Sequence, residues 1–102
     1  MPDNPVYLAL FRRLPVMAAL LDQDGCFIDV SDAWTARTGL TRAAVRGLRP
    51  EDLATPDSAR RIREELRPSF RRTGRLDNAP VEFRGEDGAV LELLVTSAAE
   101  YD

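Results

Sequence analysis

The sequence predicts an α+β protein in which short helices pack on one face of an antiparallel sheet. Two regions with strand-like patterns lie near the two ends of the chain, and a run of helical segments separates them. Each strand region holds a glycine-bearing turn between two apolar runs, which is typical of a β-hairpin. Because the helices are grouped between the hairpins rather than alternating with single strands, the order favours α+β over α/β.

The chain begins with a predicted amphipathic helix at about 5–13, capped by Asn4, with Pro5 at its first position. Pro15 ends this helix. Its apolar residues recur at the spacing of one helix face, so we expect the stripe to bind a partner and to form a homodimer. The expected dimer contacts are Val6, Tyr7, Leu10, Phe11 and Leu14.

Two hairpins supply the predicted strands. The first turns at Asp22-Gln23-Asp24-Gly25 and the second at Gly85-Glu86-Asp87-Gly88. Val81 and Phe83 alternate with charged residues, as expected for a half-buried strand. The four strands are expected at about 16–22, 26–31, 79–85 and 89–98.

Short helices are predicted between the hairpins from their caps and stops. Ser31 or Asp32 caps a helix that Gly39 ends, and a second helix runs from Thr41 to Gly47. The stretch RPEDLA (49–54) has room for one further turn.

Thr55-Pro56-Asp57 opens the longest predicted helix, at about 56–72, with a cap, a first-position proline and an acid near the N-terminus. Pro68 lies inside this helix and removes one hydrogen bond, which predicts a kink or an early end near Leu66. Seven arginines lie in 60–75, and Glu64 and Glu65 are placed to pair with them on a solvated face.

Composition excludes several kinds of chemistry. All 14 basic residues are arginine, no histidine is present and the one cysteine is Cys26. This set cannot provide a Ser-His-Asp or Cys-His catalytic group, a lysine Schiff base, an ordinary zinc site, a histidine-ligated haem or an intrachain disulfide. The Asp22–Gly25 turn lacks the glutamate that a calcium loop needs at its twelfth position. We therefore expect no enzyme, no metal and no cofactor.

The length of 102 residues predicts one domain, and the net charge of -3 argues against nucleic acid as a partner. No apolar run approaches the ~20 residues of a membrane-spanning helix, and the N-terminus does not have the pattern of a secretory signal. We expect a cytoplasmic protein with no membrane partner.

Four segments follow one another in a recognisable order: LLDQDGCFIDVSDAWTARTGL (20–40), VRGLRPEDL (45–53), TPDSARRIREELRPSFRRTGRL (55–76) and VEFRGEDGAVLELLVTSAAEYD (81–102). In this order and spacing they resemble the PAS domain, a sensory module of bacterial signalling proteins. Ser31 stands where the family often has Asn, and Leu40 where it often has Tyr. The resemblance implies that residues 1–14 are an N-terminal cap and that 15–102 form a PAS domain lacking the family's final strand, as in a fragment of a longer protein.

The resemblance also implies a central cavity walled by the short helices and the sheet. Haem-binding relatives use a histidine and photoactive flavin relatives an Asn-Cys-Arg-Phe-Leu-Gln run, and this chain has neither. A small apolar ligand, a non-covalent flavin or an entirely filled core remain open. The expected lining residues are Met17, Ala19, Leu21, Ile28, Val30, Trp34, Leu53, Ile62, Leu66, Phe83, Leu93 and Val95.

Two functions follow from the resemblance. The first is a sensory input module that passes a conformational change to an effector domain, such as a histidine kinase of a two-component system or a cyclase. The second is a dimerisation scaffold with a filled core. A small carboxylate-based enzyme is disfavoured, because both tyrosines lie near the ends of the chain.

Overall fold

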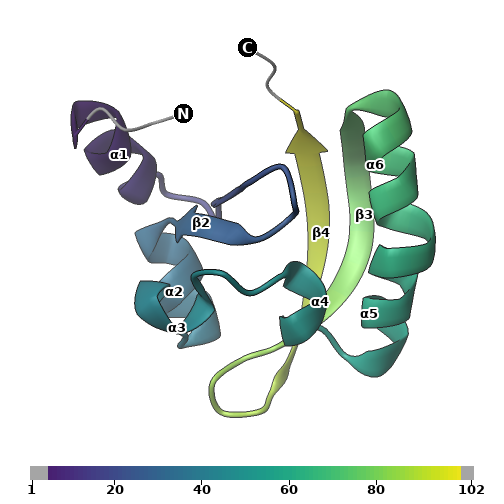
Figure 1. Cartoon of the computed structure of the whole chain (residues 1–102). Coiled ribbons are helices and arrows are strands. Elements are labelled where there is room, and N and C mark those ends of the chain that lie inside the picture. Colours follow the sequence, from purple (N-terminus) through teal and green to yellow (C-terminus); the bar gives the residue numbers. More distant parts are fainter. Residues whose placement is uncertain (1–4, 100–102) are drawn as a thin grey trace. The chain divides into compact units, whose positions relative to one another are not determined.

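The computed structural model describes residues 5–99, which form two units (Figure 1). The first comprises residues 5–49 together with 85–87, and the second comprises 50–84 and 88–99. The predicted cap Asn4 and the C-terminal Tyr101 and Asp102 lie outside the described residues. Helices and antiparallel strands occur in the predicted order, which confirms the α+β class.

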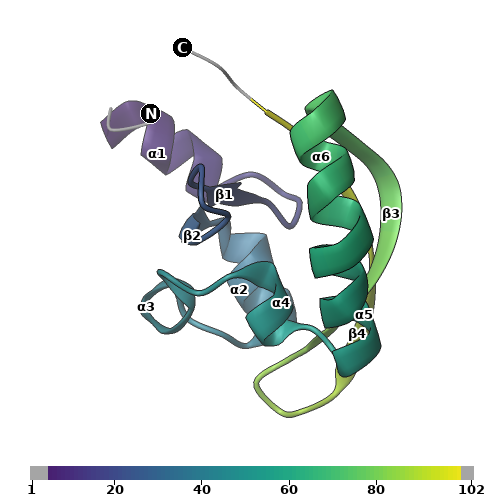
Figure 2. The same cartoon turned by 45° about the vertical axis from the view of Figure 1, so that its right-hand side comes forward.

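The first unit is built around the hairpin of β1 and β2, which Figure 2 shows between α1 and α2. The turn is held by its first residue: Asp22 Oδ1 accepts hydrogen bonds from the N–H groups of Asp24 at 2.9 Å and Cys26 at 3.0 Å. Gly25 follows at φ 85°, a value that side chains disfavour, so the predicted turn is confirmed. The elements of this unit are α1 (Pro5–Arg12), β1 (Ala19–Leu21), β2 (Phe27–Val30), α2 (Asp32–Thr38) and α3 (Arg42–Val45).

Helix α2 has only seven residues, and its ends are fixed by specific contacts. The Ser31 hydroxyl accepts from the Trp34 N–H at 3.2 Å and the Ala18 N–H at 2.9 Å, and it donates to the Val16 carbonyl at 2.8 Å. Ser31 thereby caps the helix and also fixes the chain that enters β1. A helix this short is marginal by itself, so these external bonds stabilise it.

Gly39 ends α2 as predicted, for two reasons. Its φ of 76° is left-handed, and a Cβ at this position would lie 2.9 Å from the Cβ of Glu86. The Glu86 N–H donates to the Thr38 carbonyl at 2.7 Å, which holds residues 85–87 against the end of α2. A larger residue at 39 would disturb this contact.

The second unit is a long hairpin with a helical segment beside β3, as both views show (Figures 1 and 2). The hairpin strands pair antiparallel with Val81 opposite Leu93 and Phe83 opposite Leu91. The strand begins earlier than the predicted residue 79, because Arg75 and Leu76 already pair with the partner strand; a bulge separates Leu76 from Ala79. The elements are α4 (Pro50–Leu53), α5 (Pro56–Arg61), the π-helical turn η1 (Ile62–Leu66), α6 (Arg67–Thr73), β3 (Arg75–Arg84) and β4 (Val90–Ala98).

Pro68 changes the long helix without ending it. The Arg67 N–H donates to the carbonyl of Ile62, five residues back, so η1 is one widened turn. We attribute the widening to Pro68, because proline donates no N–H and its ring crowds the preceding turn. The predicted irregularity near Leu66 is confirmed. The alternative of an early end is wrong, since α6 continues to Thr73.

Polar groups of α5 cover the outer edge of β3. The Thr55 N–H donates to the Glu82 carbonyl at 3.0 Å, and the Glu82 N–H donates to Ser58 Oγ at 2.9 Å. Arg61 donates to the Pro80 carbonyl. Pro80 has no N–H to leave unpaired at this edge, so the helix satisfies the edge groups of Pro80 and Glu82. Thr55 was expected to cap the helix with its side chain, but that hydroxyl donates to Glu82 Oε1 instead.

Candidate functional site

Trp34 is the central aromatic of the first unit, with only 4% of its surface exposed. Its ring meets that of Phe27 edge to face, with the centroids 5.6 Å apart and the planes at 62°. The Thr38 hydroxyl donates to the Trp34 carbonyl one turn back. Val30 and Val45 are fully buried in the same unit. The short helix therefore carries a large apolar side chain, whose burial offsets the helix's weak intrinsic stability.

The exposure of the β1 residues differs from what a walled cavity alone would lead one to expect. Ala19 and Leu21, both predicted lining residues, are exposed, whereas Leu20 between them is half-buried. Ala19 pairs with the fully buried Val30 and so lies on the same face of the hairpin as this second predicted lining residue. The strand is also shorter than predicted, and its pairing shifts between Leu20 and Leu21.

Two further buried residues of this unit were missed. Phe27 and Asp29 are both buried, although only Ile28 and Val30 of this strand were among the predicted lining residues. Phe27 had a detectable signal, since an aromatic at a strand start favours burial. The residues next to Asp29 in the sequence gave no signal of its burial, because its partners Arg12 and Arg42 are 17 and 13 positions away.

The predicted lining residues are divided between the two units. The cavity that they were expected to share stays a prediction. Most of these side chains are buried or half-buried, which fits apolar walls. In the first unit they are Met17, Ala19, Leu21, Ile28, Val30 and Trp34, and in the second they are Leu53, Ile62, Leu66, Phe83, Leu93 and Val95.

Asp29 lies at the centre of a cluster of charges that we call the Asp29 clasp: Asp29, Arg12, Arg42 and Asp32. Its carboxylate is 5% exposed and accepts from Arg12 Nε at 2.9 Å and from Arg42 Nε at 3.1 Å. The Val30 N–H also donates to it at 2.8 Å. A buried carboxylate needs such partners, because an unpaired buried charge is strongly unfavourable. Arg12 ends α1, so the clasp ties this helix to β2.

Arg42 is the second cation of the clasp and begins α3. Besides Asp29 it reaches the exposed Asp32 at the start of α2 and the Val30 carbonyl. The hydrogen bond to Asp32 raises the pKa of Arg42 above its ordinary value, and the charges of Asp32 and Asp29 raise it further against the opposing effect of burial. Arg42 is therefore held in its charged form.

Helix α1 presents an uncovered apolar stripe. None of its residues is buried, and Leu10 is 66% exposed. Phe11 is half-buried, unlike the other expected dimer contacts Val6, Tyr7, Leu10 and Leu14, which are exposed. The surface that was predicted to bind a partner is thus accessible in the single chain.

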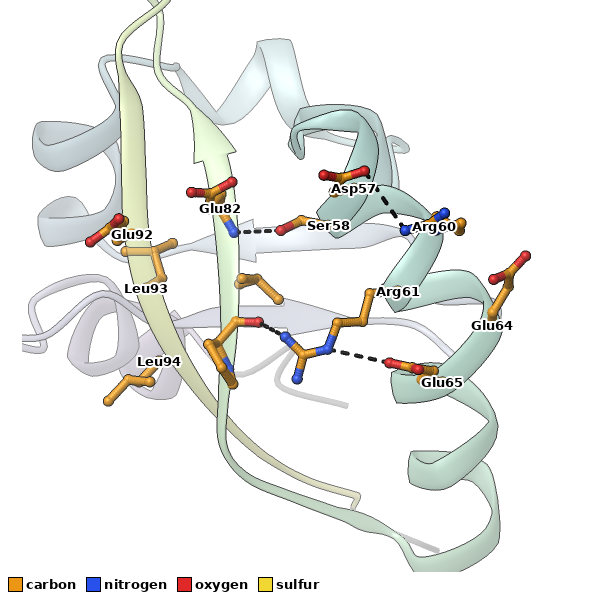
Figure 3. Close-up of a pocket in the computed structure, with 12 residues that line it drawn as sticks. Asp57, Ser58, Arg60, Arg61, Glu64, Glu65, Glu82, Glu92, Leu93 and Leu94 are labelled. Atoms are coloured by element: carbon orange, nitrogen blue, oxygen red, sulfur yellow. Dashed lines mark hydrogen bonds and ion pairs between the residues drawn. The ribbon is translucent and has the colours of Figure 1, made fainter.

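A groove of about 840 Å³ lies in the second unit along α5, η1, β3 and β4 (Figure 3). Its acidic side chains come from both sides, with Arg61 between them donating to Pro80 and pairing with Glu65 at 3.4 Å. This pair confirms the expectation of a salt-bridged arginine face, whereas Arg60 pairs with Asp57 rather than with Glu64. The sequence did not indicate this groove, and only Leu93 of the predicted lining borders it.

Within residues 5–99, no group of three or more His, Cys, Asp or Glu side chains is arranged to hold a metal ion. The same residues contain no helix with the length and apolar character of a bilayer span.

Comparison with known proteins identifies the family. The model of the PAS fold family matches residues 11–96. Among solved structures, the crystal structure of a PAS domain from Colwellia psychrerythraea superimposes with a TM-score of 0.80 at 16% identity, covering 93% of this chain and 80% of that one. No curated protein matches the chain. The order of the hairpins and helices agrees with this family, and the family model matches most of the chain. The chain therefore belongs to the PAS family of sensory and signalling modules.

Proposed function

We propose that the chain is the input module of a bacterial cytoplasmic signal-transduction protein, which binds a small ligand or a partner and passes a conformational change to an effector domain. The observation that carries this proposal is the family match over residues 11–96. An effector such as a histidine kinase or a cyclase supplies the output. The module itself has no catalytic role.

The apolar character of the buried side chains supports an apolar ligand. Trp34, Ile62 and Phe83 are all buried, and no charged residue was among the expected lining. Ligand sites are mostly apolar with a few polar groups that fix orientation. Thr38, Thr55 and Ser58 are buried hydroxyls, but each already serves a backbone or side-chain partner.

A dimerisation scaffold with a filled core is the second candidate. The complete burial of Val30 and Val45 favours it, together with the exposed stripe of α1. In this case the domain sets the geometry of a homodimer without a ligand.

Native mass spectrometry of the protein as purified separates these candidates. The sensor proposal predicts a fixed mass increment per chain that survives buffer exchange and disappears under denaturing conditions, which return the bare chain of 11.4 kDa. A bare mass under native conditions, from several preparations, would reject a resident ligand and favour the scaffold.

The α1 stripe is expected to form the dimer contact. The change Leu10→Glu should weaken dimerisation about tenfold or more, because burying a carboxylate in an apolar interface is unfavourable. Light scattering coupled to size-exclusion chromatography over a concentration series measures the effect. Leu94→Glu is the matched control, since Leu94 on β4 is 70% exposed and Leu10 is 66% exposed. Equal weakening by both variants, or by neither, contradicts an α1 contact.

A further inference from the structure

Two arginines share a single buried carboxylate in the Asp29 clasp. Arg12 binds Oδ2 and Arg42 binds Oδ1, and the two cations come from elements that lie 30 positions apart in the chain. We propose that α1 and α3 compete for Asp29, so that loosening Arg42 tightens α1 on the domain. The reading of this competition as signal transmission rests on the proposed sensory function, but the competition itself does not.

The sign follows from the charges of the cluster. Asp29 and Asp32 carry two negative charges, and Arg12 and Arg42 carry two positive ones. When Arg42 leaves, Arg12 is the one cation of the cluster on Asp29, the charge of Asp32 is no longer neutralised by Arg42, and Arg12 is held more strongly. When Asp32 is neutralised, the cluster is more positive and Arg12 is held less strongly. Because Asp29 is nearly excluded from solvent, these interactions are screened less than those of a surface pair.

Helix α1 is suited to report this effect. It is eight residues long with no buried side chain, and an isolated helix of this length is marginal in water. Attachment through Arg12, at its last position, therefore contributes to the stability of its hydrogen bonds. Detachment of α1 exposes its amides, and their exchange with solvent measures how strongly the clasp holds it.

The coupling between the two arginines also acts in the reverse direction. Coupling between two sites acts equally both ways, so a partner that seizes α1 tightens Arg42 on Asp29. Asp32 begins α2, the helix that carries Trp34, and it shares Arg42 with Asp29. A displacement of α2 or α3 therefore changes how strongly Arg12 holds α1 on Asp29. The apolar stripe of α1 is the proposed dimer contact.

The test is rapid-mixing hydrogen–deuterium exchange of a peptide covering α1, in the full chain. Arg42→Gln is expected to slow α1 exchange roughly three- to tenfold, and Asp32→Asn is expected to accelerate it by roughly two- to threefold. Structural damage accelerates exchange, so a slowing cannot come from damage. Arg12→Met should accelerate α1 exchange and abolish the slowing by Arg42→Gln.

Arg46→Gln is the matched control, because Arg46 caps the same short helix and forms no ion pair with residues 5–99. It should leave α1 exchange unchanged. The proposal is overturned if Arg42→Gln accelerates α1 exchange or leaves it unchanged while the β3–β4 peptides keep their protection. If Arg42→Gln does not fold, Asp32→Asn decides, since its side chain is 61% exposed and its loss should be tolerated. These outcomes are independent of whether a ligand is found by mass spectrometry.

Discussion

Trp34→Ala is expected to destabilise the protein by about 3–5 kcal/mol, the usual cost of removing a buried large aromatic. Trp34 is almost fully buried and packs edge to face on Phe27. Its loss removes apolar contacts and leaves a cavity in the core of the first unit. The measurement is the free energy of unfolding from urea titration monitored by circular dichroism. A loss of this size approaches the whole stability of an ordinary small domain.

Two variants make this result specific to Trp34. Trp34→Phe keeps a ring against Phe27 and should lose substantially less stability than Trp34→Ala. Leu94→Ala removes an exposed apolar side chain and should change stability by no more than about 0.5 kcal/mol. A cost below about 1 kcal/mol for Trp34→Ala would show that α2 is not held by this side chain.

The elements that were predicted correctly from the sequence are those fixed by local chemistry. Ser31 and Thr41 accept from the N–H groups of residues three positions on, and Gly25 and Gly39 take left-handed backbone angles. Each of these requirements concerns residues within a few positions of one another. A single sequence contains all the information that such caps and turns need.

The features that were missed depend on residues far apart in the chain. Asp29 is buried because Arg12 and Arg42 reach it from 17 and 13 positions away, and no neighbouring residue indicates this. Thr55 looked like an ordinary helix cap, but the edge of β3 supplied a competing acceptor on Glu82. The exposure of Ala19 and Leu21 was not indicated either, because the three residues of β1 say nothing about which distant segments cover them.

The candidate site was predictable to a similar extent. The apolar residues of the middle helices were recognisable from their spacing, and Ile62 is buried as that spacing required. The exposed stripe of α1 was recognisable for the same reason. The groove along α5 and β3 was not recognisable from the sequence. Most of its lining side chains are charged, and in the sequence they look like ordinary solvent-exposed residues of a helix and a strand.

Glu51→Ala is expected to destabilise the protein by about 3–5 kcal/mol, because it removes one partner of an ion pair that is shielded from water. The side chains of Glu51 and Arg67 are 8% and 20% exposed. They bind through two parallel hydrogen bonds, of which that from Nη1 to Oε2 is 2.7 Å long. The pair joins α4 to the start of α6, next to the widened turn before Pro68. Urea titration again gives the free energy of unfolding.

The double variant Glu51→Leu with Arg67→Met distinguishes the net contribution of the ion pair from the cost of removing only one of its partners. It should recover most of the stability lost in Glu51→Ala, because similar-sized apolar side chains often replace a buried pair without loss. Asp77→Ala is the matched surface control: its partner Arg75 and Asp77 itself are 67% and 62% exposed, and exposed pairs contribute at most about 1 kcal/mol. If Glu51→Ala costs no more than Asp77→Ala, the α4–α6 junction is held by apolar packing and the ion pair contributes little to it.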